Sequence, residues 1–162
     1  MNDTKIQAGQ QWLEELLQLM ALPSSVATAV VPEAEGGDAY WLTIDHGQLS
    51  EPQIERLIGE RGKNIDALQY LTNITLNHGL PREEQHLFTV DIGNYRQKRL
   101  DELKAIAEEV AAKVEETGEE QAIENLSSAE RRQMHTFFKE FEGLQTESRG
   151  QEPHRNLVVS LR

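Results

Sequence analysis

A glycine-bounded turn at residues 59–62 constrains the fold of this chain more than any other feature. It reads Gly59-Glu60-Arg61-Gly62 and is flanked on both sides by apolar residues at helical spacing. Those residues are Ile54, Leu57 and Ile58 before the turn, and Ile65, Leu68 and Leu71 after it. Because apolar residues three and four positions apart share one face of a helix, two helices joined by a tight turn are predicted.

The chemistry of this turn suits the backbone of a nucleic acid. Glycine adopts left-handed backbone angles at little cost and leaves no side chain in the way of a ligand. The helix that follows Gly62 begins with unpaired N–H groups, which attract anions, and Arg61 and Lys63 add positive charge. The same pattern also occurs in helix corners where glycine serves the backbone angles alone. The turn by itself therefore leaves both interpretations open.

Composition excludes several classes of protein. The 162 residues include no cysteine, so disulfides and thiolate metal sites are ruled out. No apolar run is long enough for a membrane span, and the N-terminus lacks the pattern of a signal peptide. We therefore expect a cytoplasmic protein, and no cofactor, metal or small-molecule substrate is indicated.

The charge distribution limits how tightly nucleic acid could bind. The net charge is −12, which repels phosphate at long range. Residues 127–162 are the exception, with five acidic and six basic side chains. Any nucleic-acid binding should therefore be modest in affinity and sensitive to salt.

The first half of the chain predicts an alternating series of helices and strands. Helices are expected over 6–21, from the capping Ser50 to the turn, and from Gly62 to about 77, with strands over 26–31, 40–44 and 86–92 and a turn at Gly36-Gly37. The predicted order is helix, strand, strand, helix, turn, helix, strand.

This order, together with the segment from Leu57 to Leu71, resembles a type II KH domain over residues 6–94. The resemblance implies an α+β fold with helices packed on one face of a three-stranded sheet. It also implies that the turn holds about four nucleotides by their backbone while an apolar groove takes the bases. The groove would run between the first helix of the pair and the third strand. The clamp would consist of Gly59, Glu60, Arg61 and Gly62, with Lys63 reaching phosphate; Glu60 departs from the family pattern, since a basic residue would assist more.

The second half predicts one long helix and a smaller α+β region. A helix is expected over 94–117, strands over 121–126, 144–148 and 156–161, and a further helix after Ser127-Ser128. Arg131 lies three positions after Ser128, where a glutamate would complete a capping box. The basic residues that open the long helix are expected to be solvated, and three phenylalanines at helical spacing are expected in the core. These are Arg96, Lys98 and Arg99, and Phe137, Phe138 and Phe141.

Arg131 and His135 are four residues apart and therefore share one helix face. An isolated pair of this kind is more often a salt-bridged arginine beside a half-buried histidine. Here the pair is followed by the segments 146–150 and 153–155, and together they resemble an R-x-x-x-H domain, a small module that binds single-stranded nucleic acid. The resemblance implies Arg131 and His135 as a second site, with Arg149 and Arg155 adding charge.

The junction from Asp91 to Arg96 is similar to that of the Jag/KhpB family, whose members join a KH domain to an R-x-x-x-H domain. The match covers nearly the whole chain and implies a short form without the extra N-terminal domain of many members. It implies domains at 1–94 and 95–162, joined through the long helix, and binding of single-stranded RNA in post-transcriptional regulation or RNA chaperoning. Single-stranded DNA and a KH-containing protein are further candidate partners.

Two other functions stay open at this point. The acidic first half favours a protein adapter, for example on the ribosome, in which the KH fold is a pairing surface. A nuclease using His135 and His154 with Glu130 or Glu152 is the weaker alternative, because no metal-binding carboxylate cluster and no nucleophile–base pair stands out. We therefore expect no catalytic residue and a binding protein rather than an enzyme.

Overall fold

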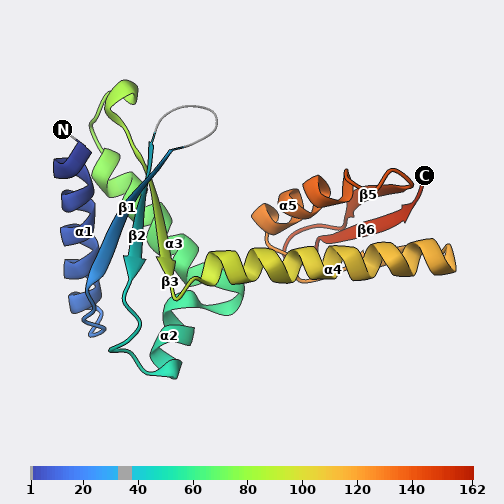
Figure 1. The fold of residues 1–162 in the computed structure, drawn as a ribbon, viewed down its shortest axis with the longest axis horizontal. Helices are drawn as coiled ribbons and strands as arrows, with labels where there is room; N and C mark the ends of the chain where they lie inside the picture. The colour runs from blue at the N-terminus through green and yellow to red at the C-terminus, as the bar shows by residue number, and fades with distance from the viewer. Residues whose placement is uncertain (1, 33–37) are drawn as a thin grey trace. The chain divides into compact units, whose positions relative to one another are not determined.

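The fold was analysed in a computed structural model that describes residues 2–32 and 38–162. It confirms a mixed α+β protein, and the chain divides into two compact units, Met1–Arg96 and Gln97–Arg162 (Figure 1). The glycine turn expected at 36–37 lies outside the described residues. No helix in the described ranges is long and apolar enough to cross a bilayer.

The N-terminal unit is a three-stranded sheet with its helices on one face. Its elements are α1 (Asn2–Leu19), β1 (Val26–Pro32), β2 (Asp38–Ile44), α2 (Glu51–Ile58), the 3-10 turn η1 (Glu60–Gly62), α3 (Lys63–Asn77), the 3-10 turn η2 (Arg82–Glu84) and β3 (Leu87–Ile92). The strand order is β1-β2-β3, with β1 antiparallel and β3 parallel to β2. A parallel neighbour requires a crossover connection, which α2 and α3 provide.

Strand periodicity decides which side chains of this sheet are buried. Successive side chains alternate between the two faces of a strand, and Tyr40, Leu42 and Ile44 of β2 are all fully buried. They share one core with α1, α2 and α3. Trp41 points to the opposite face of β2 and is only partly buried. The helices therefore cover a single face of the sheet.

Helix α3 also satisfies the outer edge of β3. The Asn73 side chain accepts from the Phe88 amide (2.9 Å) and donates to the Phe88 carbonyl (2.7 Å). Asn77 makes the same pair of bonds with His86, and Gln69 accepts from the Val90 amide at 3.0 Å. Because these three residues recur every four positions, they form one row along α3 and replace a missing strand neighbour.

The C-terminal unit packs two helices against a second three-stranded sheet. Its elements are α4 (Tyr95–Thr117), whose first two residues fall in the N-terminal unit, β4 (Gln121–Ile123), α5 (Ser128–Phe138), β5 (Leu144–Arg149) and β6 (Asn156–Leu161). The strand order is β4-β6-β5, and both pairs are antiparallel. The expected strand over 121–126 is shorter than predicted, because Asn125 takes a left-handed backbone angle (φ 63°) that ends the extended segment.

The start of α5 also differs from the prediction. The capping residue is Ser127 rather than Ser128, so Glu130, not Arg131, occupies the third helical position. The Ser127 hydroxyl accepts from the Glu130 amide (3.1 Å), and the Glu130 carboxylate accepts from the Ser127 amide (2.8 Å). This completes a capping box. The other Glu130 oxygen accepts from Arg99 Nε at 2.7 Å, which ties α4 to the start of α5.

The burial of α1 gives a stability test for the N-terminal unit. Leu17 is fully buried and Leu19 is 86% exposed, although both lie in the last turn of the same helix. Leu17→Ala should lower the free energy of unfolding by about 2–5 kcal/mol because it leaves a cavity. Leu19→Ala should change it by no more than about 0.5 kcal/mol. Urea unfolding followed by tryptophan fluorescence measures this unit, since Trp12 and Trp41 both lie in it; equal losses in the two variants would contradict the packing.

Candidate nucleic-acid interface

The turn between α2 and α3 has an unusual backbone. Gly59, Arg61 and Gly62 all have positive φ angles, of 73°, 54° and 76°. Arg61 therefore holds a left-handed conformation that costs a non-glycine residue free energy. Two glycines and one strained arginine in four residues reverse the chain within one turn, so that α3 starts at Lys63.

Both glycines are also required by close packing. A Cβ atom added to Gly59 would lie 2.6 Å from Asn64 Cγ, and one added to Gly62 would lie 2.7 Å from Tyr95 Oη. The Asn64 side chain is fixed in turn, because its amide donates to the Arg56 carbonyl at 2.7 Å. The absence of a side chain at these two positions thus lets the turn pack against the protein.

Charged side chains of the turn are paired with one another. The Glu60 carboxylate lies 3.1 Å from Arg61 Nη2 and 3.9 Å from Lys63 Nζ. Glu60 and Lys63 are about two-thirds exposed, whereas the Arg61 side chain is 30% exposed. The turn therefore presents two cations whose charge is partly neutralised by an acid in their midst.

The first turn of α4 supports the glycine turn from behind. Arg96 pairs with Asp66 of α3 (2.9 Å) and donates to the Val90 carbonyl of β3 (2.8 Å). Its backbone amide donates to the buried Asp91 at 3.2 Å. The expectation that Arg96 is merely solvated is wrong, because two elements of the N-terminal unit supply its partners. These bonds hold the start of α4, and with it Tyr95, beside Gly62.

In the C-terminal unit, Arg131 is buried. Only 6% of its side chain is exposed. Its guanidinium donates to the carbonyls of Leu126 (2.8 Å) and Arg155 (3.2 Å) and to the Ser128 hydroxyl (3.1 Å), and it pairs with the Glu152 carboxylate. Arg131 thus joins the start of α5 to the segment between β5 and β6.

His135 lies one turn further along α5 and faces β5. Its Nδ1 is 2.6 Å from the Thr146 hydroxyl and its Nε2 is 3.0 Å from the Ser148 hydroxyl. Burial lowers the pKa of His135 below its ordinary value, and the nearby charges of Arg155, Lys139 and Arg131 lower it further. The imidazole is therefore predominantly neutral at pH 7 and stands in a positive field.

The two remaining predicted arginines lie in different settings. Arg155 is exposed, and its backbone carbonyl is fixed by Arg131. Arg149 follows Thr146 and Ser148 at odd spacing, so its side chain leaves β5 on the face opposite to theirs. There it is bound by Glu120, at 2.7 and 3.0 Å, and by Glu147, and these acids raise the pKa of Arg149. The structure therefore brings Arg131, His135 and Arg155 together and separates Arg149 from them.

The carboxylates considered for a nuclease have other partners. Glu130 accepts from Arg99 and Ser127, and Glu152 from Arg131 and Ser128. Within residues 2–32 and 38–162, no group of three or more histidines, aspartates or glutamates could hold a metal ion. These acids serve helix capping and ion pairing.

Sequence reasoning missed several residues that shape both sites. Asn64 and Tyr95 give no signal of their own, since only the tertiary contact places them against Gly59 and Gly62. Thr146 and Ser148 carry a usable signal, because hydroxyls two positions apart in a strand share one face. Glu152 was linked to catalysis, yet it pairs with Arg131.

Comparison with known proteins now adds a family. The family model of the R-x-x-x-H domain matches residues 101–161. Proteins described as "RNA-binding protein KhpB" are similar to the chain: 33% identity over 106 residues in Clostridium symbiosum, 36% over 107 in Lactiplantibacillus plantarum and 31% over 157 in Bacillus subtilis. These alignments cover 65%, 65% and 96% of this chain, and 47%, 32% and 70% of those relatives. The chain thus spans less than half the length of the first two. The match to most of the Bacillus subtilis protein shows that this chain belongs to the KhpB family.

Proposed function

We propose that the protein binds single-stranded RNA through two modules and acts in post-transcriptional regulation or as an RNA chaperone. The observation that carries this proposal is the pairing of His135 with two strand hydroxyls beside the exposed Arg155, inside the segment that matches a nucleic-acid-binding family. The relatives' printed name, an RNA-binding protein, supports RNA over DNA as the partner.

In the proposal, the C-terminal module contacts RNA through His135, Arg155 and the hydroxyls of Thr146 and Ser148. Hydroxyl and imidazole groups can exchange their mutual hydrogen bonds for bonds to phosphate or ribose. Arg131 acts as a positioning residue, since its buried guanidinium holds the carbonyl of Arg155. Arg149 contributes only if phosphate displaces its bound carboxylates.

The N-terminal unit is proposed to be a type II KH domain, over about residues 1–94. Its element order and its left-handed glycine turn support this assignment. Arg61 and Lys63 would contact the RNA backbone, and bases would lie between α2 and β3. Two weak sites on one chain can act together on one strand, which raises the overall affinity.

The first test compares the two modules directly. Arg61→Ala/Lys63→Ala and His135→Ala/Arg155→Ala should each weaken binding of a labelled single-stranded RNA in fluorescence anisotropy. The slope of log affinity against log salt should fall by about 0.7 for each lost phosphate contact. Arg131 is left intact because its burial makes it a folding residue as well.

A matched control removes the same charge elsewhere. Arg82→Ala/Lys113→Ala replaces two exposed cations, one in each unit, outside both proposed sites. It should leave affinity within about twofold, since only long-range charge changes. If the native chain fails to bind at about 50 mM salt, where phosphate contacts are strongest, the RNA proposal is wrong and the acidic adapter becomes the better account.

Glu60 provides a test with the opposite sign. Because its carboxylate pairs with both cations of the turn, Glu60→Gln should increase RNA affinity by about two- to fivefold, the size of an exposed ion pair. Glu83→Gln, an equal charge change at an exposed site in η2, should have little effect. Equal gains in the two variants would show that net charge, and not the turn, is responsible.

The lowered pKa of His135 predicts a pH dependence. A bound phosphate favours the charged imidazole, so the complex takes up a proton and affinity should rise as pH falls from about 7.5 to about 5.5. His135→Asn should remove most of this rise. His86→Asn is the control, since burial also lowers the pKa of His86 but it lies in the other unit.

Folding has to be checked over the same range. A histidine whose pKa is lowered in the folded state binds more protons when unfolded, so stability falls as pH drops below about 6.5. Circular dichroism should confirm that each variant stays folded at pH 5.5. An affinity that falls with acidification in a folded native chain would contradict the role of His135.

A further inference from the structure

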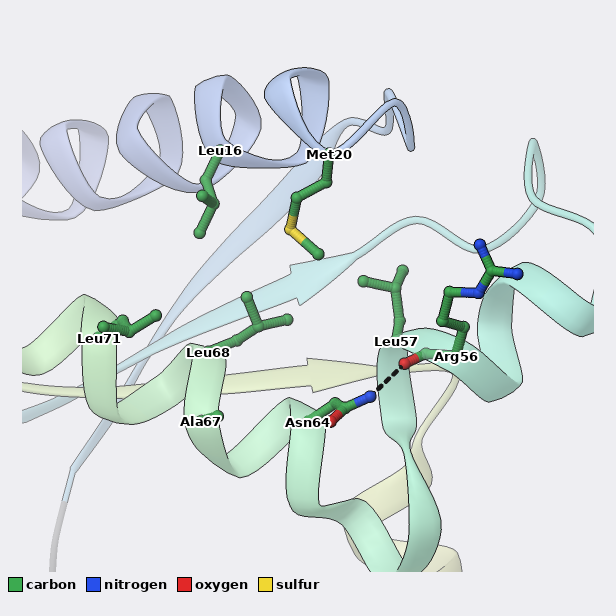
Figure 2. A pocket seen from close by; sticks show the side chains of 8 residues that line it. All are labelled: Leu16, Met20, Arg56, Leu57, Asn64, Ala67, Leu68 and Leu71. Carbon is green, nitrogen blue, oxygen red and sulfur yellow. Dashed lines mark hydrogen bonds between the residues drawn. The ribbon is translucent and has the colours of Figure 1, made fainter.

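An apolar groove lies on the helical side of the N-terminal unit, and no residue of β3 lines it. It has a volume of about 280 Å³ and runs between α1 and α3, with the end of α2 closing it (Figure 2). Leu16 and Met20 line one wall, and Leu68 and Leu71 line the other. In Figure 2 the two helices run in opposite directions, so the groove follows their axes.

The groove continues into an exposed apolar surface. Met20 and Leu71 are 44% and 47% exposed at its mouth. Tyr70 and Ile74, on the outer side of α3, and Leu19, in the last turn of α1, are also exposed large apolar side chains. Scattered exposed leucines are ordinary, but a groove that merges with a contiguous apolar surface marks an interaction site.

One end of the groove carries a positive charge. Arg56 lines it together with Asn64, whose amide is used by the Arg56 carbonyl. The Arg56 guanidinium is exposed and makes no hydrogen bond or ion pair with any residue that the structure describes. The turn's other cations differ in this respect, because Arg61 and Lys63 are paired with Glu60.

From this arrangement we infer that the groove binds an amphipathic helix of a partner protein, with an acidic residue that pairs with Arg56. From Asn64 to Leu71 the wall spans two helical turns, about 10 Å, which matches leucine-like side chains at i, i+4 and i+7 of a docked helix. Methionine and leucine walls adapt to such side chains. A strand of RNA would need a phosphate-binding group at each step, and Arg56 is the one cation among the lining residues.

The test uses two synthetic helical peptides that differ at one position. Both carry leucine at i, i+4 and i+7; one has glutamate and the other lysine one turn beyond. Fluorescence anisotropy of the labelled peptides should show binding to the native chain, with the glutamate peptide preferred by about two- to fivefold. Arg56→Glu should reverse this preference, which a merely structural role of Arg56 could not do.

Two groove variants and one matched variant locate the binding site. Met20→Glu and Leu71→Glu should each weaken peptide binding by at least about tenfold, since a carboxylate then has to be buried against leucine. Leu87→Glu is the control, because Leu87 is equally exposed (48%) in the same unit but lies on β3, outside the groove. Circular dichroism checks that all three remain folded.

Several outcomes would overturn the inference. They are no binding of either peptide up to about 1 mM, binding without a charge preference, and equal loss in Leu87→Glu. Sedimentation of the native chain and of Leu71→Glu adds a fourth: a dimer that the substitution dissociates would show that a second copy covers the groove. RNA affinity, measured on the same samples, is a separate readout, so failure here leaves the RNA proposal standing.

Discussion

The contacts of Gly59 with Asn64 and of Gly62 with Tyr95 are the constraint on which the N-terminal candidate site depends. They bring the turn closer to the protein than any residue with a Cβ atom would allow. Tyr95 is in turn held by the bonds that Arg96 makes to α3 and β3. The glycines therefore serve packing and backbone angle together, and the exposed charges of the turn are a consequence of that packing.

Charge in both candidate sites is partly neutralised from within the chain. Glu60 pairs with the cations of the turn, Glu152 with Arg131, and Glu120 and Glu147 with Arg149. In a chain with a net charge of −12, these acids hold cations in place that would otherwise be dispersed in solvent. Such an arrangement favours a ligand that offers several phosphates at once, because each has to compete with a carboxylate already bound.

Helix α3 has a different role on each side. The row Gln69, Asn73 and Asn77 bonds to the backbone of β3 and closes the edge of the sheet. Tyr70, Leu71 and Ile74 lie on the outer side and remain exposed. The helical repeat of about 3.6 residues separates these two sets, so a single helix can both complete the sheet and offer an apolar surface.

Local sequence determined the order of elements, the strand faces and the glycine turn, because these depend on spacing within a few residues. Tyr40 and Trp41 fell on opposite faces of β2 as alternation requires. The capping serine was misassigned by one position, since Ser127 and Ser128 are chemically equivalent and only the bonds of Glu130 distinguish them.

Tertiary structure decided what each charged residue does. The sequence placed Arg131, Arg149 and Arg155 in one motif, but it could not show that Arg131 is buried or that Arg149 faces away from His135. It also gave no sign of the groove between α1 and α3, whose walls come from distant parts of the chain. Spacing along the chain fixes which face of an element a residue occupies, whereas burial and pairing depend on which other element packs against that face.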